Sequence, residues 1–484
     1  MNIRLSLYVV GSFLKYLGLV MLVPGICSVI YRESTIWIFL ASGLITSLTG
    51  YIIEKTSKHG ETPLELERKD GFLIASSCWI FASIFGAIPY LLFGMFTNPV
   101  DAIFESVSGF TTTGATVITN IEALPHSILL WRNFTQWLGG MGIIVLAIAI
   151  LPRLSVGGMQ LMGLETSGPT SEKITPRIAE AAKKLWAIYL LFTVLLVLLL
   201  ILGGMPLFDS IAHSFSTLSI GGFSTNSLSI AAYKNPLIEI IIMVFMILAG
   251  VNFVLHYAAF RGDFRKIAQN SELRFYILAL IITIIFVTLN IWMRYSYDFL
   301  SSFRFASFQV TSILTTTGFT TADFNLWPSF SKWMLFILMF VGACAGSTSG
   351  SVKMIRIMVL FKKAYREIRK IIYPRVVMPL RVDNKAVDED AISSITSFFL
   401  LFLFLFVLGA FLIMFVEGTD LITSISASAA TIGNVGPGFG EVGALEHYAH
   451  FATFTKVLLC ILMLVGRLEL FTILVLFTPA FWRK

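Results

Sequence analysis

Four short stretches decide the fold: DAIFESVSGFTTTGAT (101–116), DSIAHSFSTLSIGGFS (209–224), FASFQVTSILTTTGFT (305–320) and DLITSISASAATIGNV (420–435). Aligned without gaps, each has glycine at its fourteenth position: Gly114, Gly222, Gly318 and Gly433. Each stretch lies between two long apolar runs, which predicts a repeated unit of helix, half-helix, glycine-bearing loop and helix. Three stretches begin with an aspartate that we expect to cap the half-helix: Asp101, Asp209 and Asp420.

The composition of the whole chain indicates a membrane protein. Of its 484 residues 56% are hydrophobic and only 13% are charged, whereas soluble domains carry about 25% charged residues. A bilayer-spanning helix needs about 20 apolar residues, and ten runs of that kind are predicted to cross. They lie near 8–30, 36–54, 72–96, 127–152, 184–204, 235–257, 274–296, 330–358, 391–416 and 450–479. An ordinary soluble enzyme and a disordered chain are both excluded.

The position of the positive charges predicts the orientation. Most of the 35 Lys and Arg residues lie at the two termini and in alternate connecting segments, 54–71, 153–184, 258–274 and 353–385. Cytoplasmic segments of membrane proteins carry such an excess, so both termini are predicted to be cytoplasmic. The net charge of +7 is therefore a topology signal, and no nucleic-acid partner is expected.

The half-helices are too short to span, so they are predicted to be re-entrant and to meet around a shared axis. The alternative is four surface loops in which glycine serves only turn geometry. The loops contain no carboxylate, which favours a filter of backbone carbonyls for a weakly hydrated monovalent cation. The candidate filter residues are Thr112, Thr113 and Gly114; Ile220, Gly221 and Gly222; Thr316, Thr317 and Gly318; and Thr431, Ile432, Gly433 and Asn434.

These loops resemble the degenerate filter loops of the Trk/Ktr/HKT superfamily of potassium transporters, and the likeness covers about 70–480. The resemblance implies an all-α integral membrane protein with four pseudo-repeated helix–pore-loop–helix units around one central pore. Two extra N-terminal transmembrane helices match the TrkH branch. The predicted parts are 1–69 for the extra helices, then pore units 70–152, 183–260, 272–358 and 391–480.

Two further features lie in the second helices of units three and four. The first is a stretch whose glycines should break a helix: Gly342, Gly346, Ser347, Thr348, Ser349 and Gly350. It is either a close-packed face of small residues or, as the resemblance implies, an intramembrane gating loop. The second is Arg467 within an apolar run. It either pairs with Glu469, extends its charged end to the membrane surface or, as the resemblance implies, projects into the permeation path.

The resemblance implies potassium uptake across the bacterial inner membrane through a channel-like or ion-coupled (symport) pore. Gly114 stands where some plant members carry serine and favour sodium, so it argues for potassium. A homodimer and a cytosolic nucleotide-binding ring of TrkA type are the implied partners, and no organic cofactor is expected in this chain. The alternative is an alternating-access, ion-coupled transporter of another small solute. No enzyme is expected, because the sequence lacks a nucleophile–base or metal constellation.

Overall fold

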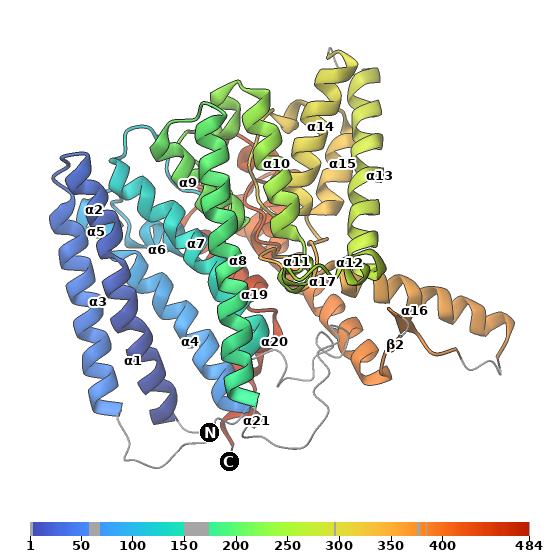
Figure 1. Cartoon of the computed structure of the whole chain (residues 1–484), viewed down its shortest axis with the longest axis horizontal. Helices are drawn as coiled ribbons and strands as arrows, with labels where there is room; N and C mark the ends of the chain where they lie inside the picture. The colour runs from blue at the N-terminus through green and yellow to red at the C-terminus, as the bar shows by residue number, and fades with distance from the viewer. Residues whose placement is uncertain are drawn as a thin grey trace.

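The protein is an assembly of helices in the computed structural model, which describes residues 3–57, 68–149, 174–294, 297–374, 378–383 and 385–483. Within these ranges the strands are limited to β1 (Arg381–Val382) and β2 (Lys385–Ala386), a small antiparallel hairpin. Parts of the predicted basic segments 54–71 and 153–184 lie outside the described residues. The described ends of the chain lie at the same end of the molecule (Figure 1).

The three N-terminal helices lie together at one edge of the molecule, beside α4 (Figure 1). They are α1 (Ile3–Val20), α2 (Leu22–Ile30) and α3 (Ile36–Ser57). Small residues bring α1 and α3 into backbone contact: a Cβ added to Gly11 would lie 2.8 Å from the carbonyl oxygen of Gly50. Such glycine contacts let membrane helices approach closely. Lys15 and Glu54 join the same two helices by an ion pair of 2.7 Å.

The rest of the chain forms the four predicted units, each with a half-helix between longer helical segments. Unit one contains α4 (Arg68–Gly86), α5 (Ile88–Phe93), α6 (Pro99–Phe110) and α7 (His126–Ala149). Unit two contains α8 (Ile174–Leu202), α9 (Leu207–Leu218), η3 (Ser229–Tyr233), α10 (Pro236–Gly250) and α11 (Phe253–Phe260), and is followed by α12 (Phe264–Gln269). The half-helices of these units are α6 and α9.

Units three and four repeat the pattern. Unit three contains α13 (Ser271–Arg294), α14 (Phe299–Leu314), η4 (Phe324–Leu326), α15 (Ser329–Leu338) and α16 (Met354–Ile372). Unit four contains α17 (Glu389–Glu417), α18 (Leu421–Ile432), η5 (Gly440–Val442), α19 (Thr453–Arg467), α20 (Phe471–Leu474), η6 (Val475–Phe477) and α21 (Pro479–Trp482). Their half-helices are α14 and α18. The predicted all-α fold with four units and two extra helices is confirmed.

Three of the apolar runs predicted to cross are interrupted in their second helices. The interruption in unit three is the one predicted from the glycines of 342–350, whereas those in units two and four are not predicted. Among the described residues, six helices are long and apolar enough to cross a membrane, and two bent pairs raise this to eight. The chain turns by 100° between α10 and α11 and by 109° after α19, while α15 ends after only ten residues. The breaks fall at or near Gly250, Gly342 and Gly466. The protein is a multi-pass membrane protein in which the second helices of units two, three and four are broken at matching places, whereas α7 of unit one is continuous from His126 to Ala149.

Only one of the three predicted aspartate caps is confirmed. Asp420 caps α18 by accepting two backbone N–H groups. In α6 the cap is Asn98, and Asp101 lies in the first turn, where it forms a 2.7 Å ion pair with Lys456 of unit four. Asp209 also lies inside its helix and accepts a threonine hydroxyl. Asp101 and Asp209 do not cap their helices because they lie inside the first turn. Their carboxylates bond to neighbouring segments instead.

Candidate functional site

Each half-helix ends in the same turn. After its last residue the backbone turns so that an N–H group bonds back to the carbonyl five residues earlier, at 2.8–2.9 Å. The four N–H groups belong to Thr113, Gly221, Thr317 and Val435. The repeated hydrogen bond fixes the structural register of the four loops independently of the sequence alignment.

The residue before each of these four has a left-handed backbone. The φ values are 54° for Thr112, 55° for Ile220, 63° for Thr316 and 53° for Asn434. Three of the four are β-branched, for which this conformation is a genuine outlier. Strain of this kind costs about 1–3 kcal/mol per residue and persists only where the surroundings impose it. The same left-handed conformation therefore recurs at matching places in all four loops.

The glycine two residues further on lets each loop touch the next one. Gly114, Gly222, Gly318 and Gly436 all have positive φ, between 78° and 98°. A Cβ added to Gly114 would collide with the carbonyl oxygen of Gly221, and one added to Gly436 would lie 2.5 Å from that of Thr113. Added Cβ atoms at the other two would collide with the carbonyl oxygens of Thr317 and Val435. The contacts run from unit to unit and return to the first, so the loops form a closed ring.

The predicted register of the fourth loop is wrong by three residues. Gly433 was aligned with Gly114, but its φ of −81° places it at the C-terminal cap of α18. Thr431 and Ile432 belong to the last turn of that helix. The residues that match 112–114 are Asn434, Val435 and Gly436. An ungapped alignment missed this because the loop reads GNVG (433–436), and its second glycine, Gly436, lies just beyond the aligned stretch.

A signal in the sequence could have found the right register. Asparagine tolerates the left-handed conformation better than other non-glycine residues, and Asn434 precedes Gly436 by the spacing that separates Thr112 from Gly114. The sequence reasoning therefore missed two residues of the ring, Val435 and Gly436.

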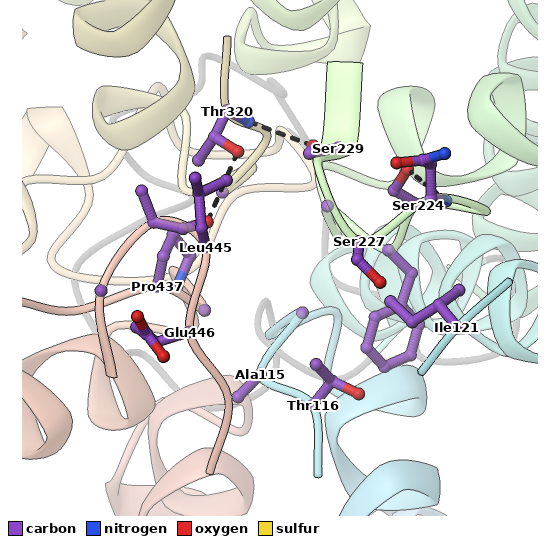
Figure 2. Close-up of a pocket in the computed structure, with 18 of the residues that line it drawn as sticks. Ala115, Thr116, Ile121, Ser224, Ser227, Ser229, Thr320, Pro437, Leu445 and Glu446 are labelled. Carbon is purple, nitrogen blue, oxygen red and sulfur yellow. Dashed lines mark hydrogen bonds between the residues drawn. The ribbon is translucent and has the colours of Figure 1, made fainter. Parts of the chain in front are cut away.

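The ring opens on one side to a small cavity of about 70 Å³. The four positive-φ glycines line it, together with the loop residues that follow them. Figure 2 shows Thr116, Ser224, Thr320, Pro437 and Glu446 around this cavity, contributed by all four units. A hydrogen bond of 3.2 Å from the backbone N–H of Thr320 to the hydroxyl of Ser229 joins unit three to unit two there. The cavity is the mouth of the ring.

The glycine-rich segment of unit three lies against the other side of the ring. It connects α15 to α16 without a helix. The Thr348 hydroxyl donates to the carbonyl of Leu218, the last residue of α9, at 3.0 Å. The Gly350 N–H donates to the hydroxyl of Thr316 in the third loop at 2.8 Å. The segment therefore touches the ring and the C-terminal end of a half-helix.

The same segment is folded tightly on itself, which brings the predicted residues together. The N–H of Gly342 donates to the carbonyl of Val352 at 2.9 Å, and a Cβ at Gly342 would collide with the carbonyl oxygen of Gly350. Ser347 and Ser349 share a hydrogen bond of 3.0 Å, and Gly346 has a φ of 74°. Glycine is required here by close backbone contact and by a left-handed turn.

Arg467 is buried against this segment. Its side chain is 2% exposed, and Nη1 donates to the carbonyl of Thr348 at 2.8 Å. Nη2 lies 3.4 Å from the carbonyl of Gly139, and Nε has no hydrogen-bond partner among the described residues. The alternative ion pair with Glu469 is not present, because Glu469 pairs with Arg356 of α16 instead. The guanidinium is thus bonded to backbone carbonyls of units one and three.

A carboxylate that the sequence reasoning did not single out holds both sides of the segment. Glu272, at the start of α13, accepts the N–H of Ala345 at 2.6 Å and that of Ile355 at 3.1 Å. The neighbouring Ser271 bonds to Asp383 in the turn between β1 and β2. The sequence indicates this role of Glu272 only weakly, because a glutamate in the first turn of a helix usually interacts favourably with the helix dipole.

Comparison with known proteins gives the family. The family model described as "TrkH: Cation transport protein" matches residues 38–484. The chain belongs to the TrkH family of cation transport proteins. The TrkH-family chain is 42% identical to the "Trk system potassium uptake protein TrkH" of Halomonas elongata over the full length of both, and 39% identical to that of Escherichia coli. Its fold matches the crystal structure of the potassium transporter TrkH from Vibrio parahaemolyticus with a TM-score of 0.91, 37% identity and complete coverage of both chains.

Proposed function

We propose that this protein takes up potassium through a channel-like pore in the bacterial inner membrane, with both termini in the cytoplasm. The closed ring of loops is the observation that carries the proposal, because a ring of backbone carbonyls replaces the hydration shell of a monovalent cation. The half-helices also direct their C-terminal ends, which carry partial negative charge, toward the ring. The full-length relatives named as potassium uptake proteins support the same ion.

The proposed filter uses one set of positions in each unit. These are Thr112–Gly114, Ile220–Gly222, Thr316–Gly318 and Asn434–Gly436. The parts 70–152, 183–260, 272–358 and 391–480 are proposed to form the four quarters of the filter, and 1–69 lies outside it. Residues 1–2, 58–67, 150–152 and 295–296 of these ranges lie outside the described structure. Potassium is then the cargo of the protein, which acts as a transporter and not as an enzyme.

We propose that the segment Gly342–Gly350 is the gate and that Arg467 places a positive charge in the path below the filter. The contacts of Thr348 with the end of α9 and with Arg467 support this role. The basic helix α16 and the hairpin β1–β2 follow the segment directly, which makes them the proposed docking face for a TrkA-type cytosolic ring. The protein is proposed to act as a homodimer with one pore per protomer.

Uptake of radioactive rubidium or potassium in cells that lack their own potassium uptake tests the function. With the cytosolic partner supplied, we expect the chain to restore growth at low external potassium. Failure to restore growth, with the protein present in the membrane, would rule the proposal out. Dependence on an organic solute instead of potassium would favour the alternating-access alternative.

Replacing Gly114 by serine is expected to raise sodium uptake relative to potassium uptake. The φ of 83° penalises any side chain, and the added Cβ collides with the Gly221 carbonyl. That carbonyl must move, so the carbonyl oxygens of the ring no longer keep the spacing that fits a potassium ion. Parallel sodium and rubidium flux measurements check this, and unchanged ion ratios would remove Gly114 from the filter.

Replacing Glu272 by alanine is expected to raise flux in the absence of the cytosolic partner. The carboxylate bonds to N–H groups on both sides of the gate segment, and each hydrogen bond to a charged group contributes about 1.5–3 kcal/mol. Losing both hydrogen bonds destabilises the observed conformation of the gate segment and favours one that leaves the path open. Partner-free rubidium uptake is the measurement, and Glu272→Gln, which keeps an acceptor oxygen, is the matched control. Equal partner-free uptake in Glu272→Ala and wild type would show that Glu272 does not hold the gate segment closed.

A further inference from the structure

A buried ion pair lies behind the first and second loops of the ring. Arg132 of α7 donates from Nε to Glu105 of α6 at 2.8 Å, and their side chains are 1% and 0% exposed. Desolvating two charges costs several kcal/mol per ion, so a buried pair is a poor source of stability by itself. Its other contacts show what the pair holds in place.

Glu105 holds the first loop just beyond its glycine. Its carboxylate accepts the hydroxyl of Thr116 at 3.0 Å and the backbone N–H of Val117 at 3.1 Å. Thr116 lines the cavity at the mouth of the ring (Figure 2). The carboxylate therefore fixes the direction of the chain as it leaves Gly114.

Arg132 holds the second loop at the matching place. Its Nη1 donates to the backbone carbonyl of Ser224 at 3.1 Å, and its guanidinium lies over the ring of Phe223 at 4.1 Å from the centroid. Phe223 and Ser224 directly follow Gly222, as Ala115 and Thr116 follow Gly114. One ion pair thus connects the outer ends of two neighbouring loops.

Ser224 is held from its other side by His213 of α9. The Nδ1 of His213 lies 2.9 Å from the backbone carbonyl of Asp209, and its Nε2 lies 3.0 Å from the Ser224 hydroxyl. A carbonyl only accepts, so Nδ1 donates and the Nε2 of the neutral ring accepts from the hydroxyl. Ser224 is therefore bonded through both its carbonyl and its side chain.

The other three half-helices have no carboxylate at the position of Glu105. In the register set by the left-handed residues, the positions that match Glu105 are His213, Gln309 and Ala427. Gln309 makes a 3.3 Å hydrogen bond to the carbonyl of Ala322 in its own loop. The first two loops are thus tied together by a charged link, and the third is supported by a neutral one.

We propose that the Glu105–Arg132 pair is a positioning element that sets the spacing of the first two filter loops and thereby the discrimination between potassium and sodium. The hydrogen bonds that the pair makes to the loops go to residues that follow each glycine: Thr116, Val117 and Ser224. This inference rests on the proposed function. A fixed spacing matters because sodium is rejected only if the carbonyls do not close around the smaller ion.

The experiment compares potassium and sodium uptake by Glu105→Gln and wild type in the same cells, with the cytosolic partner present. The variant leaves Arg132 without its charge partner and puts an amide group where the carboxylate accepts hydrogen bonds from Arg132, Thr116 and Val117. We expect the potassium-to-sodium ratio to fall about tenfold, which corresponds to about 1.4 kcal/mol of discrimination. A ratio does not depend on how much protein folds, so a merely structural role would leave it unchanged.

Asp101→Asn is the matched control. It removes a carboxylate from the same half-helix and breaks the ion pair with Lys456, and within the described ranges neither side chain has a hydrogen bond or ion pair to a filter loop. We expect its ratio to equal that of wild type, even if less protein reaches the membrane. If both variants lower the ratio equally, the effect belongs to α6 as a whole and the proposal is overturned.

Thr116→Val provides a second, milder variant if Glu105→Gln does not reach the membrane. It keeps the ion pair and deletes one hydroxyl that bonds to Glu105, so a fall of about threefold is expected, about 0.65 kcal/mol. An unchanged ratio would overturn the proposal. The proposed function fails separately, if wild type shows no preference for potassium at all.

Discussion

Replacing Gly436 by alanine is expected to abolish potassium selectivity and to reduce rubidium uptake more than tenfold. Gly436 has a φ of 98°, and the added methyl group would lie 2.5 Å from the carbonyl oxygen of Thr113. Backbone strain and the displaced carbonyl both raise the barrier to permeation, and an increase of about 1.4 kcal/mol in that barrier already lowers the rate of uptake tenfold. Rubidium and sodium uptake at matched protein levels are the measurements.

Gly204→Ala separates the pore effect from backbone strain alone. Gly204 precedes α9 with a φ of 92°, and nothing lies within 4 Å of the position its Cβ would occupy. The two variants carry the same conformational penalty, but only Gly436→Ala displaces a filter carbonyl. Near-normal selectivity in Gly436→Ala would place the fourth loop in a different register from the one seen here.

Replacing Arg467 by glutamine is expected to raise potassium flux about tenfold, equivalent to removing a barrier of about 1.4 kcal/mol. The guanidinium is buried, bonds only to the carbonyls of Thr348 and Gly139 among the described residues, and faces no carboxylate there. A positive charge so placed opposes a cation in the path. Losing it also loosens the gate segment, so both effects act in the same direction.

Two further variants test whether the charge causes the effect. Arg467→Lys keeps the positive charge and should stay close to wild-type flux, although it cannot bond to both carbonyls. Lys456→Gln removes another buried positive charge from the same helix, and its flux should not rise, because Lys456 pairs with Asp101 away from the gate. A fall in flux in Arg467→Gln would assign Arg467 to packing alone.

Some parts of the site followed from local chemistry, and others did not. The loop glycines of units one to three were predicted correctly as to position, since each stands in an unambiguous run of small and β-branched residues. Gly436 was missed because two glycines compete in the fourth loop. The sequence does not predict the break of α10 at Gly250, because the fifteen residues of α10 include a single charged residue, Glu239. They therefore indicate one continuous apolar span with the residues that follow.

The partner of Arg467 shows the same limit. Its sequence neighbour Glu469 is one of the alternative partners that the sequence leaves open. The turn of 109° after α19 places Glu469 against Arg356 and leaves Arg467 against Thr348. The Glu105–Arg132 pair joins residues from different helices of unit one, and their loop partners lie in units one and two. No spacing rule along the chain foretells such contacts.

The sequence by itself determined the membrane setting, the fourfold repeat and the family, because these depend on composition and on periods that local residues carry. Tertiary structure alone decided which glycine completes the ring, where the second helices break and which groups hold the loops. Those choices depend on close contacts between different units. A collision between the Cβ position of Gly436 and the carbonyl of Thr113 exists only once the first and fourth loops have met.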